Sequence, residues 1–355
     1  MAQLENLIAQ RRPFQAALHA WFRVHQRKLP WRDAPSLYKT VVSEFMLQQT
    51  QVTTVLPYFD RWLRALPDFP ALAAASGAQV MKLWEGLGYY SRARNLHRLA
   101  QAVARLPAPP RTPADWRELP GIGPYTAAAI TSISFAEPAA VVDGNVVRIL
   151  ARLTGEGRLF RDGSEAAKYF TPLADALIVG SNPGEHNQAM MELGATVCVR
   201  QNPLCLVCPV AEFCTAGKSG EPAEFPRLKP RQIEQRTVAR LWCEHGGKLL
   251  LRRGHAGARR LAGLYELPEA ADLGLKVPGK KSLLAVKRRA ITRFRITESI
   301  YRVPPGVALL RHVRTAEALE WVPWEELAGL TLSGPHKRWI AELRAAAGSS
   351  TPAQS

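Results

Sequence analysis

The sequence predicts two domains, an all-helical one followed by one that combines strands with a helix. A chain of 355 residues can bury two hydrophobic cores. Apolar residues recur at helical spacing in the first part of the chain, whereas the alternation typical of strands begins after residue 236. Between them, residues 218–235 are rich in Pro, Lys, Glu and Arg and predict a linker. The predicted domains are therefore residues 1–217 and 236–347, with a disordered tail at 348–355.

The charge of the chain favours a polyanionic partner. Lys and Arg outnumber Asp and Glu by 47 to 30, the net charge is +17, and basic residues are spread along the whole chain. In a globular composition this excess favours nucleic acid over a merely solvated basic surface. A membrane fits less well, because no apolar run is long enough to span one and the N-terminus lacks a secretory signal. We expect a cytoplasmic, monomeric, bacterial-type protein associated with the nucleoid.

The helical part begins with two amphipathic stretches. Apolar spacing predicts a helix over 14–27, which ends before Pro30. The stretch 36–66 has apolar helical segments that flank four polar residues, 48–51. Burying four polar side chains costs free energy unless they have polar partners, so this run is either a solvated helix end or a contact for a polar ligand.

A glycine-containing segment at 86–94, GLGYYSRAR, follows another helix and puts aromatic residues beside arginines. This mixture suits stacking on bases and neutralising phosphates. Buried packing of a tyrosine is the competing interpretation, and we expect it for Tyr90.

The centre of the helical part is the stretch 119–152. Pro120-Gly121-Ile122-Gly123-Pro124 supplies two glycines for a tight bend and a proline where a helix begins. The free N–H groups of such a helix start can bind a phosphate, although a plain helix corner is the alternative. Further on, Asp143 precedes an apolar helical run and is a good helix N-cap.

Four of the five cysteines lie in one window after two further predicted helices. Their spacing is Cys198-x6-Cys205-x2-Cys208-x5-Cys214, which lets four thiolates converge and differs from the paired C-x2-C units of structural zinc. Cys243 is expected to be a buried thiol.

The two helices before the cysteines are predicted over 164–179 and 185–195, with a turn at 180–184. In the C-terminal part, strands are predicted over 237–244, 248–253, 264–268, 296–303 and 318–322. A hairpin is predicted about 246–247, and a last helix over 324–347.

Five motifs, in order, resemble those of the adenine DNA glycosylases of the endonuclease III, or helix–hairpin–helix, superfamily. They are SEFMLQQTQV, GLGYY, LPGIGPYTA, VVDGNV and the four cysteines. Each alone is weak, but chance agreement of all five in order is remote. The resemblance implies a multidomain fold, in which an all-α helix–hairpin–helix glycosylase domain with an iron–sulfur loop is joined to an α+β Nudix-like domain. It also implies a [4Fe–4S] cluster held by Cys198, Cys205, Cys208 and Cys214.

The activity that the resemblance implies is excision of adenine mispaired with 8-oxoguanine or guanine in duplex DNA, in base excision repair. A monofunctional enzyme would flip the adenine out and hydrolyse its N-glycosidic bond. In family terms Glu44 protonates adenine N7 and Asp143 stabilises the sugar cation, supported by Tyr125 and Asn145. One carboxyl must be protonated and the other charged, so we expect their pKa values to be pushed apart. The alternatives are a surface carboxylate for Glu44 and an ordinary N-cap for Asp143.

Further residues are implied to contact DNA. Gln49 and Tyr89 would wedge into the base stack, and a phosphate would be gripped at the hairpin. The segment Ile291-Thr292-Arg293 stands where the family usually has Phe-Ser-His, which leaves open how strictly 8-oxoguanine is preferred. The C-terminal part also lacks a Nudix box, so no pyrophosphatase activity is expected. The remaining contacts implied are Gly121 and Gly123 in the hairpin, Arg32 and Glu192 in the adenine pocket, Arg200 toward a phosphate, and Thr292 and Arg293 at the partner base.

Two other functions are alternatives. An endonuclease III-like glycosylase and lyase acting on oxidised pyrimidines needs a Schiff-base lysine just after the hairpin, where this chain has Tyr125. A non-catalytic iron–sulfur module that binds DNA gains nothing from two carboxylates, Glu44 and Asp143, that face phosphates.

Overall fold

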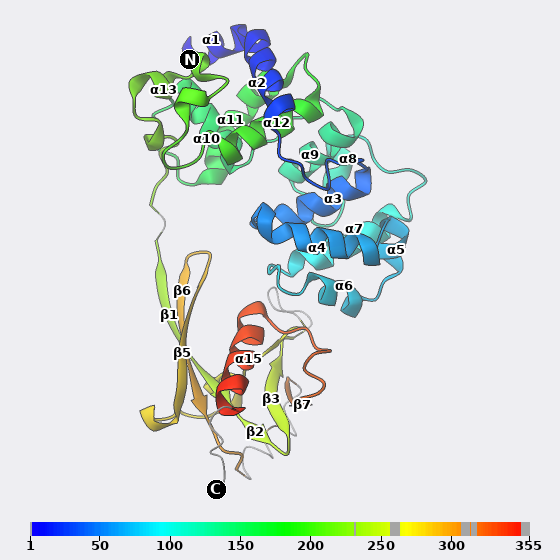
Figure 1. Cartoon of the computed structure of the whole chain (residues 1–355), viewed down its shortest axis with the longest axis vertical. Helices are drawn as coiled ribbons and strands as arrows, with labels where there is room; N and C mark the ends of the chain where they lie inside the picture. Colours follow the sequence, from blue (N-terminus) through cyan, green and yellow to red (C-terminus); the bar gives the residue numbers. More distant parts are fainter. Residues whose placement is uncertain (1, 231, 256–262, 307–312, 314–317, 349–355) are drawn as a thin grey trace. The chain divides into compact units, whose positions relative to one another are not determined.

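The computed structural model describes residues 2–230, 232–255, 263–306, 313 and 318–348. The chain forms two compact units (Figure 1). The first consists of Met1–Ala74 with Asn95–Pro230, and the second of Ala75–Arg94 with Arg231–Ser355. Within the described residues, no helix has both the length and the apolar character needed to cross a membrane. The predicted tail, apart from residue 348, lies outside the described residues.

The first unit is helical, as predicted. The stretch 36–66 forms two helices that meet at the polar run 48–51, so this run breaks the helix. Ser36 begins the first of these helices by accepting a hydrogen bond from the Lys39 N–H (3.2 Å). The helices are α1 (Ala2–Ala9), α2 (Arg11–His25), α3 (Leu37–Leu47), α4 (Val52–Ala65), α5 (Phe69–Ala74), α7 (Ser91–Val103, which begins in the second unit), α8 (Pro113–Arg117), α9 (Pro124–Phe135), α10 (Gly144–Thr154), α11 (Gly163–Ile178), α12 (Pro183–Thr196) and α13 (Thr215–Ser219), with 3₁₀ turns at Cys205–Val207, Ala211–Phe213 and Pro222–Glu224.

Helix α10 lies at the centre of one hydrophobic core of this unit. Its residues Val146, Ile149, Leu150 and Leu153 recur at helical spacing and are all buried. They pack with buried residues of α2, α11 and α12. This packing holds the first residues of α10, and with them Asp143, in a fixed place.

Residues 218–230, which we predicted as part of a linker, pack with the first unit. The Phe160 N–H donates to the Arg227 carbonyl, and the Lys229 N–H donates to the Phe160 carbonyl, both at 2.9 Å. The Arg152 guanidinium donates to the Pro222 carbonyl at 2.7 Å. Backbone hydrogen bonds of this kind leave no compositional signal, so composition placed the start of the linker too early in the chain.

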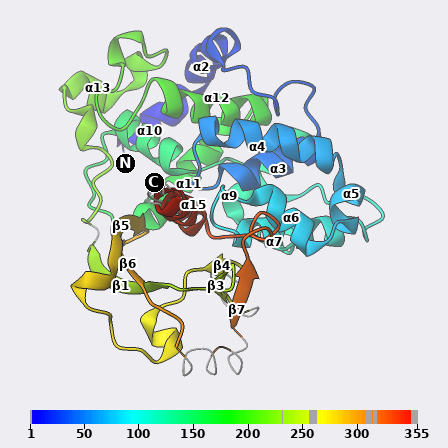
Figure 2. The ribbon, with the colours of Figure 1, turned by 60° about the horizontal axis from the view of Figure 1, so that its bottom comes forward.

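The second unit holds the strands in two sheets. The first has the order β1-β6-β5 and the second the order β2-β3-β4, with β7 paired to β3. Helix α15 lies between the two sheets (Figures 1 and 2). The elements are α6 (Gly77–Trp84), β1 (Glu234–Trp242), β2 (Glu244–His245), β3 (Lys248–Arg253), β4 (Tyr265–Glu266), β5 (Leu283–Ile291), β6 (Phe294–Arg302), β7 (Leu319–Pro323) and α15 (Gly334–Gly348), with 3₁₀ turns at Ala270–Leu273 and Lys280–Ser282.

Several strand predictions need correction. The hairpin about Gly246-Gly247 exists, but only β2 and β3 form it, while β1 runs parallel to β6. Strand β5 was not predicted, and it pairs antiparallel with β6. Helix α15 begins at Gly334 and not at residue 324. These errors concern which strands pair and where a helix begins, and both depend on contacts between residues distant in the sequence.

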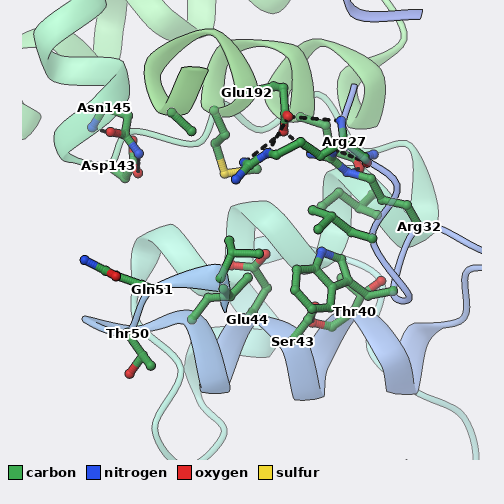
Figure 3. A pocket seen from close by; sticks show the side chains of 18 of the residues that line it. Arg27, Arg32, Thr40, Ser43, Glu44, Thr50, Gln51, Asp143, Asn145 and Glu192 are labelled. Atoms are coloured by element: carbon green, nitrogen blue, oxygen red, sulfur yellow. Dashed lines mark hydrogen bonds and ion pairs between the residues drawn. The ribbon is translucent and has the colours of Figure 1, made fainter. Parts of the chain in front are cut away.

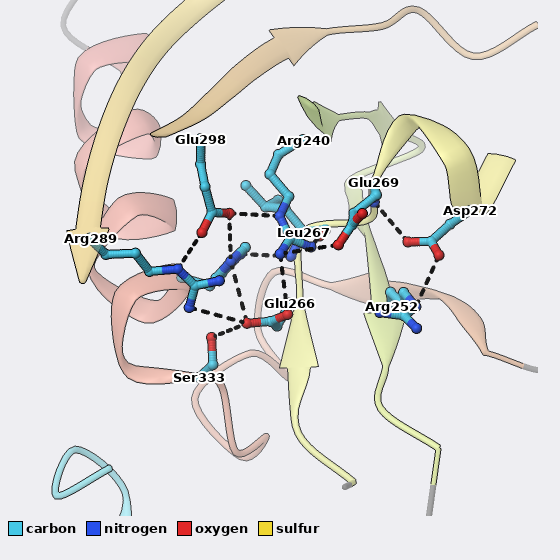
Figure 4. Close-up of polar contacts among 10 residues, drawn as sticks. Arg240, Arg252, Glu266, Leu267, Glu269, Asp272, Arg289, Glu298 and Ser333 are labelled. Atoms are coloured by element: carbon cyan, nitrogen blue, oxygen red, sulfur yellow. Dashed lines mark hydrogen bonds and ion pairs between the residues drawn. The ribbon is translucent and has the colours of Figure 1, made fainter. Parts of the chain in front are cut away.

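A buried ion network joins the first sheet to strand β4 (Figure 4). Arg240 on β1 donates to Glu298 on β6 at 2.7 Å and lies 3.5 Å from Glu266 on β4. Arg289 on β5 pairs with the same Glu298, which is fully buried. Burial opposes the charge of Glu298, but the His336 hydrogen bond and the two arginines outweigh it and lower its pKa to about 2. Glu298 therefore stays charged, and the network couples four strands of this unit, β1, β4, β5 and β6.

Candidate active site

The first unit contains a cavity of about 500 Å³ between α3 and α12 (Figure 3). The segment before α3, the turn between α3 and α4 with the first residues of α4, parts of α9 and the start of α10 complete its walls. Its volume is typical of a site for a small ligand. It brings together six residues that the sequence analysis predicted as site residues: Arg32, Glu44, Tyr125, Asp143, Asn145 and Glu192.

Glu44 lies on α3 and faces this cavity from a buried position. It is 6% exposed, and its Oε2 atom has no hydrogen-bond partner within the described residues. Burial, with a smaller contribution from the Asp143 charge, raises the pKa of Glu44 to about 7, against a hydrogen bond from Tyr125 that lowers it. The surface-carboxylate alternative is therefore wrong. Near neutral pH the Glu44 carboxyl can therefore hold a proton and donate it into the cavity.

Tyr125, from the first turn of α9, lies beside Glu44. Its hydroxyl lies 3.3 Å from the Met191 sulfur, and it can instead donate its single proton to the Glu44 carboxyl, a hydrogen bond that lowers the pKa of that carboxyl. Burial and the charges of Glu44 and Asp143 raise the pKa of Tyr125 well above its ordinary value. Tyr125 is therefore neutral and can act only through its hydroxyl hydrogen bonds.

Asp143 is the N-cap of α10, and it also lines the cavity, so both interpretations of this residue apply together. Its Oδ1 accepts from the N–H groups of Asn145 (2.9 Å) and Val146 (2.8 Å), and its Oδ2 accepts from the Asn145 amide (3.0 Å). Burial raises the pKa of Asp143, and these three bonds and the Arg148 charge oppose the rise. Asp143 thus has several donors that favour its charged form, whereas Glu44 has one.

Arg148 connects this carboxylate to the cysteine loop. One of its nitrogens donates to Asn145 Oδ1 at 3.0 Å, and another donates to the Cys198 carbonyl at 2.7 Å. An added Cβ at Gly194 would lie 2.5 Å from Asn145 Cβ, so only glycine fits there. Asn145 is therefore held on both sides.

Glu192 is a fully buried carboxylate with both oxygens paired. Its Oε1 accepts from Arg27 at 2.6 Å, and its Oε2 accepts from Arg32 at 2.9 Å. Burial opposes the charge on Glu192, but the Arg27 hydrogen bond and the charges of both arginines outweigh it and lower its pKa. Sequence analysis missed Arg27, because nothing local separates it from other basic residues. The same is true of Gln188, whose amide oxygen accepts from Arg32 at 3.0 Å.

Other predicted contact residues lie outside the residues that line the cavity. Gln49, Tyr89 and Thr292 are three of only six non-glycine residues with positive φ in the described part of the chain. Such backbone is strained and often marks a functional site. Tyr89 is 46% exposed, whereas Tyr90 is buried, as predicted. Arg200 is exposed, and its carbonyl accepts from Arg152 at 2.9 Å.

The hairpin between α8 and α9 has the geometry expected of an anion site. Gly121 has a φ of +78°, and an added Cβ there would lie 2.5 Å from Asn95 Cβ. Gly123 is the N-cap of α9 and has no side chain to occupy the first N–H groups of that helix. These groups can bind a phosphate oxygen.

The four window cysteines line one small cavity, as a shared centre requires. Two of the sulfurs accept hydrogen bonds, Cys198 from Arg152 (3.2 Å) and Cys214 from the Gly217 N–H (3.3 Å). Among the described side chains, no three His, Cys, Asp or Glu converge as closely as a single metal ion needs. In a [4Fe–4S] cluster each of four thiolates binds a different iron, and four cysteines that line one cavity supply that number. Cys243 is buried in the second unit, as predicted.

The purified protein should be brown and contain about four irons per chain, the content of one cubane cluster. Cys208→Ala should lower the iron content, whereas Cys243→Ala, at the cysteine outside the window, should leave it unchanged. Iron, zinc and acid-labile sulfide are measured in anaerobically prepared protein. Stoichiometric zinc without iron would contradict the cluster assignment.

Two family models match segments that contain these sites. Residues 42–169 match the HhH-GPD superfamily of base excision DNA repair proteins. Residues 198–214 match the iron–sulfur binding domain of endonuclease III. The second match supports a [4Fe–4S] cluster in this loop, in which Cys198, Cys205, Cys208 and Cys214 are the thiols that would hold it.

Relatives and a solved structure are similar to more than half of the chain. The adenine DNA glycosylase of Schizosaccharomyces pombe is 40% identical over 57% of this chain and 49% of its own length. The adenine DNA glycosylase of Homo sapiens is 44% identical over 59% of this chain and 40% of its own. The chain thus spans about half the length of these relatives or less. A thermostable thymine-DNA glycosylase of known structure shares the fold at 24% identity, with a TM-score of 0.52, over 59% of this chain and 98% of its own.

Proposed function

We propose, from the premise that the chain belongs to the helix–hairpin–helix superfamily of base excision DNA repair proteins, that it excises adenine from mispairs in duplex DNA. The reaction is hydrolysis of the N-glycosidic bond of an adenine opposite 8-oxoguanine or guanine. The relatives named above, 40% and 44% identical, support the choice of adenine. The net charge of +17 supports DNA as the partner.

The observation that carries the proposal is the pair of carboxyls, Glu44 and Asp143, that line one cavity in different environments. Glu44 has a pKa of about 7 because it is buried, so it can hold a proton at neutral pH. The Asp143 carboxylate accepts three hydrogen bonds within the α10 cap. One group can donate a proton while the other supplies negative charge, which is the pairing that glycosidic cleavage needs.

The reaction begins with an extruded nucleotide. Unstacking a base costs a few kcal/mol, which contacts of Gln49, Tyr89 and the hairpin with DNA would offset. The adenine enters the cavity, where Glu44 donates its proton to N7 and turns the base into a neutral leaving group. As the bond breaks, positive charge develops on the sugar, and the Asp143 carboxylate stabilises it. Water then adds to the sugar carbon, and the proton that it releases goes to the Glu44 carboxylate, which restores the acid.

Glu192 supports binding in this scheme and takes no part in the chemistry. Because Arg27 and Arg32 occupy both of its oxygens, it holds their guanidinium groups at the cavity wall. The guanidinium groups can then donate to a base or to the sugar–phosphate backbone. The iron–sulfur cluster, when bound, supplies no redox step in this scheme and fixes the loop that carries Arg200 near DNA phosphate.

A glycosylase and lyase acting on oxidised pyrimidines receives no support from the site. Tyr125 stands where that class has its lysine, and a phenol cannot form a Schiff base.

The test is a single-turnover assay on duplexes with adenine opposite 8-oxoguanine, guanine, cytosine or thymine. Adenine should be released from the first two duplexes, and the DNA strand should stay intact until alkali is added. Strand cleavage without alkali, or release of oxidised pyrimidines in place of adenine, would contradict the proposal.

The second unit, by the same proposal, is a Nudix-like domain that reads the partner base through the tip of the β5–β6 hairpin. Thr292 and Arg293 form the two-residue turn there, and Arg293 pairs with Glu234 at 2.8 Å while its side chain is 60% exposed. This pair leaves guanidinium donors available at the tip. The protein would act on the bacterial nucleoid, in the cytoplasm and as a monomer.

Thr292→Ala combined with Arg293→Ala should lower the preference for 8-oxoguanine over guanine by about tenfold, because one base-reading contact is typically worth about 1–3 kcal/mol. Release from the guanine duplex should stay within about twofold of wild type. Lys281→Ala, an exposed change at the opposite end of β5, is the control. The ratio of the two single-turnover rates is measured, and an unchanged ratio would remove the hairpin tip from the reading of the partner base.

A further inference from the structure

The loop that presents Tyr89 is held by residues from the C-terminal part of the chain. The segment Ala75–Arg94 lies within the range 42–169 that matches the superfamily, yet it packs with Arg231–Ser355 as one compact unit. Helix α6 ends at Trp84, and the loop 85–90 leads into α7. The Tyr89 loop, as we call residues 85–90, therefore belongs to the same unit as α15.

Glu85 joins the loop to α15. Its side chain is 4% exposed, and its Oε2 accepts from Lys337 Nζ (2.5 Å) and from Lys82 Nζ (3.1 Å). Its Oε1 accepts from the Leu332 N–H at 3.1 Å. Burial opposes the charge on Glu85, but these hydrogen bonds outweigh it and lower its pKa. Glu85 is therefore an ionised, buried anchor whose partners are two lysines and one backbone N–H.

Two further residues, Lys82 and Tyr90, make hydrogen bonds around this anchor. Lys82 also donates to two carbonyls of the segment before α15, at 2.6 and 3.0 Å. The Tyr90 hydroxyl donates to the Leu332 carbonyl at 3.2 Å and accepts from the Gly86 N–H at 3.4 Å. The residues on both sides of Tyr89 are thus bound to one short stretch before α15.

Tyr89 itself faces solvent from this fixed loop. Its side chain is 46% exposed and its φ is +47°. The preceding carbonyl, of Gly88, accepts from the Trp84 indole and from Arg92, both at 3.1 Å. The Arg92 guanidinium lies 5.5 Å from the centre of the Tyr89 ring. An exposed aromatic ring on a rigid backbone, with a cation beside it, suits stacking on a nucleic-acid base.

We propose that Lys337 and Glu85 are positioning residues for Tyr89, so that α15 sets the backbone from which this ring stacks on DNA. The inference rests on the proposed function only in taking DNA as the partner. Without Lys337, the buried Glu85 carboxylate would lose its shortest ion pair, and the loop would be free to relax. Tyr89 would then lose its stacking geometry although Tyr89 itself had not changed.

The experiment is a double-mutant cycle on the full-length chain. The probe is a duplex with a tetrahydrofuran abasic analogue opposite guanine, which binds without releasing a base. Tyr89→Ala should weaken its binding about tenfold, since one stacking contact is worth about 1–3 kcal/mol. Lys337→Met should weaken binding by a similar factor in the wild-type chain, but by less than about twofold when Tyr89 is already Ala.

Two matched variants complete the cycle. Lys337→Arg keeps a cation at Glu85 and should bind within about twofold of wild type. Arg338→Met removes a neighbouring cation of α15 whose side chain is 71% exposed, and it should have no effect in either background. If melting curves show that Lys337→Met does not fold, Glu85→Gln takes its place in the same cycle.

The inference would be overturned if the losses of affinity from Lys337→Met and Tyr89→Ala multiplied in the double variant. It would also be overturned if Tyr89→Ala bound the duplex as tightly as wild type, or if Lys337→Arg bound as weakly as Lys337→Met. Adenine release by the wild-type chain is measured in parallel. Its absence would overturn the proposed activity and leave the coupling result standing. Normal adenine release without coupling would overturn only the positioning role.

Discussion

Glu44→Gln should lower the rate of adenine release by about 10²–10⁴-fold, the usual value of a positioned general acid. The amide keeps the shape of the side chain but has no proton of suitable acidity to donate to N7. Binding of the duplex should change little, because the loss is one of chemistry. Single-turnover rates and affinities are measured for the same preparations, and Glu5→Gln, at an exposed carboxyl of α1, serves as the control.

The same residue should govern the pH dependence. With the pKa of Glu44 raised to about 7, the protonated fraction and the rate should fall about tenfold per pH unit above neutrality. The raised pKa of Glu44 also makes the stability of the fold depend on pH. Between the unfolded pKa of 4.5 and the folded value of about 7, rising pH destabilises the wild type by about 3 kcal/mol in all, because only the unfolded chain ionises freely.

Glutamine does not titrate, so the melting temperature of Glu44→Gln relative to wild type should rise from pH 5 to pH 8. A release rate within about tenfold of wild type would remove Glu44 from the acid role. A melting-temperature difference that does not change with pH would mean that the buried carboxyl keeps its ordinary pKa.

Asp143→Asn should lower adenine release by about 10²–10³-fold, the loss typical when one electrostatic contact to the transition state is removed. Asparagine caps helices about as well as aspartate, so α10 should stay folded and the protein should keep its cluster absorbance. The loss would then report the missing negative charge opposite the sugar cation.

The chain supplies a matched control for this variant in Asp162. It caps α11 in the same way and accepts from the N–H groups of Ser164 and Glu165, both at 2.9 Å, but it does not line the cavity. Asp162→Asn should therefore leave the rate unchanged. If Asp143→Asn lost its cluster or its fold while Asp162→Asn did not, the main role of Asp143 would be structural.

The features that the sequence predicted well are those whose physical cause is local. Capping chemistry placed Asp143 at a helix start, and the polar run 48–51 marked the break between α3 and α4. Glycines marked the hairpin before α9, and cysteine spacing marked the loop that holds the cluster. Each depends on residues a few positions apart, so the sequence alone was enough.

Only the tertiary structure decided which distant residues meet and how deeply they are buried. The pKa of Glu44 follows from its burial beside Tyr125, and the pairing of Arg27 with Glu192 joins residues 165 positions apart. Strand β1 pairs with β6 and not with its neighbour in sequence, and the Tyr89 loop packs with residues near α15. Desolvation and long-range pairing arise only when the chain is packed, so no local pattern in the sequence carries them.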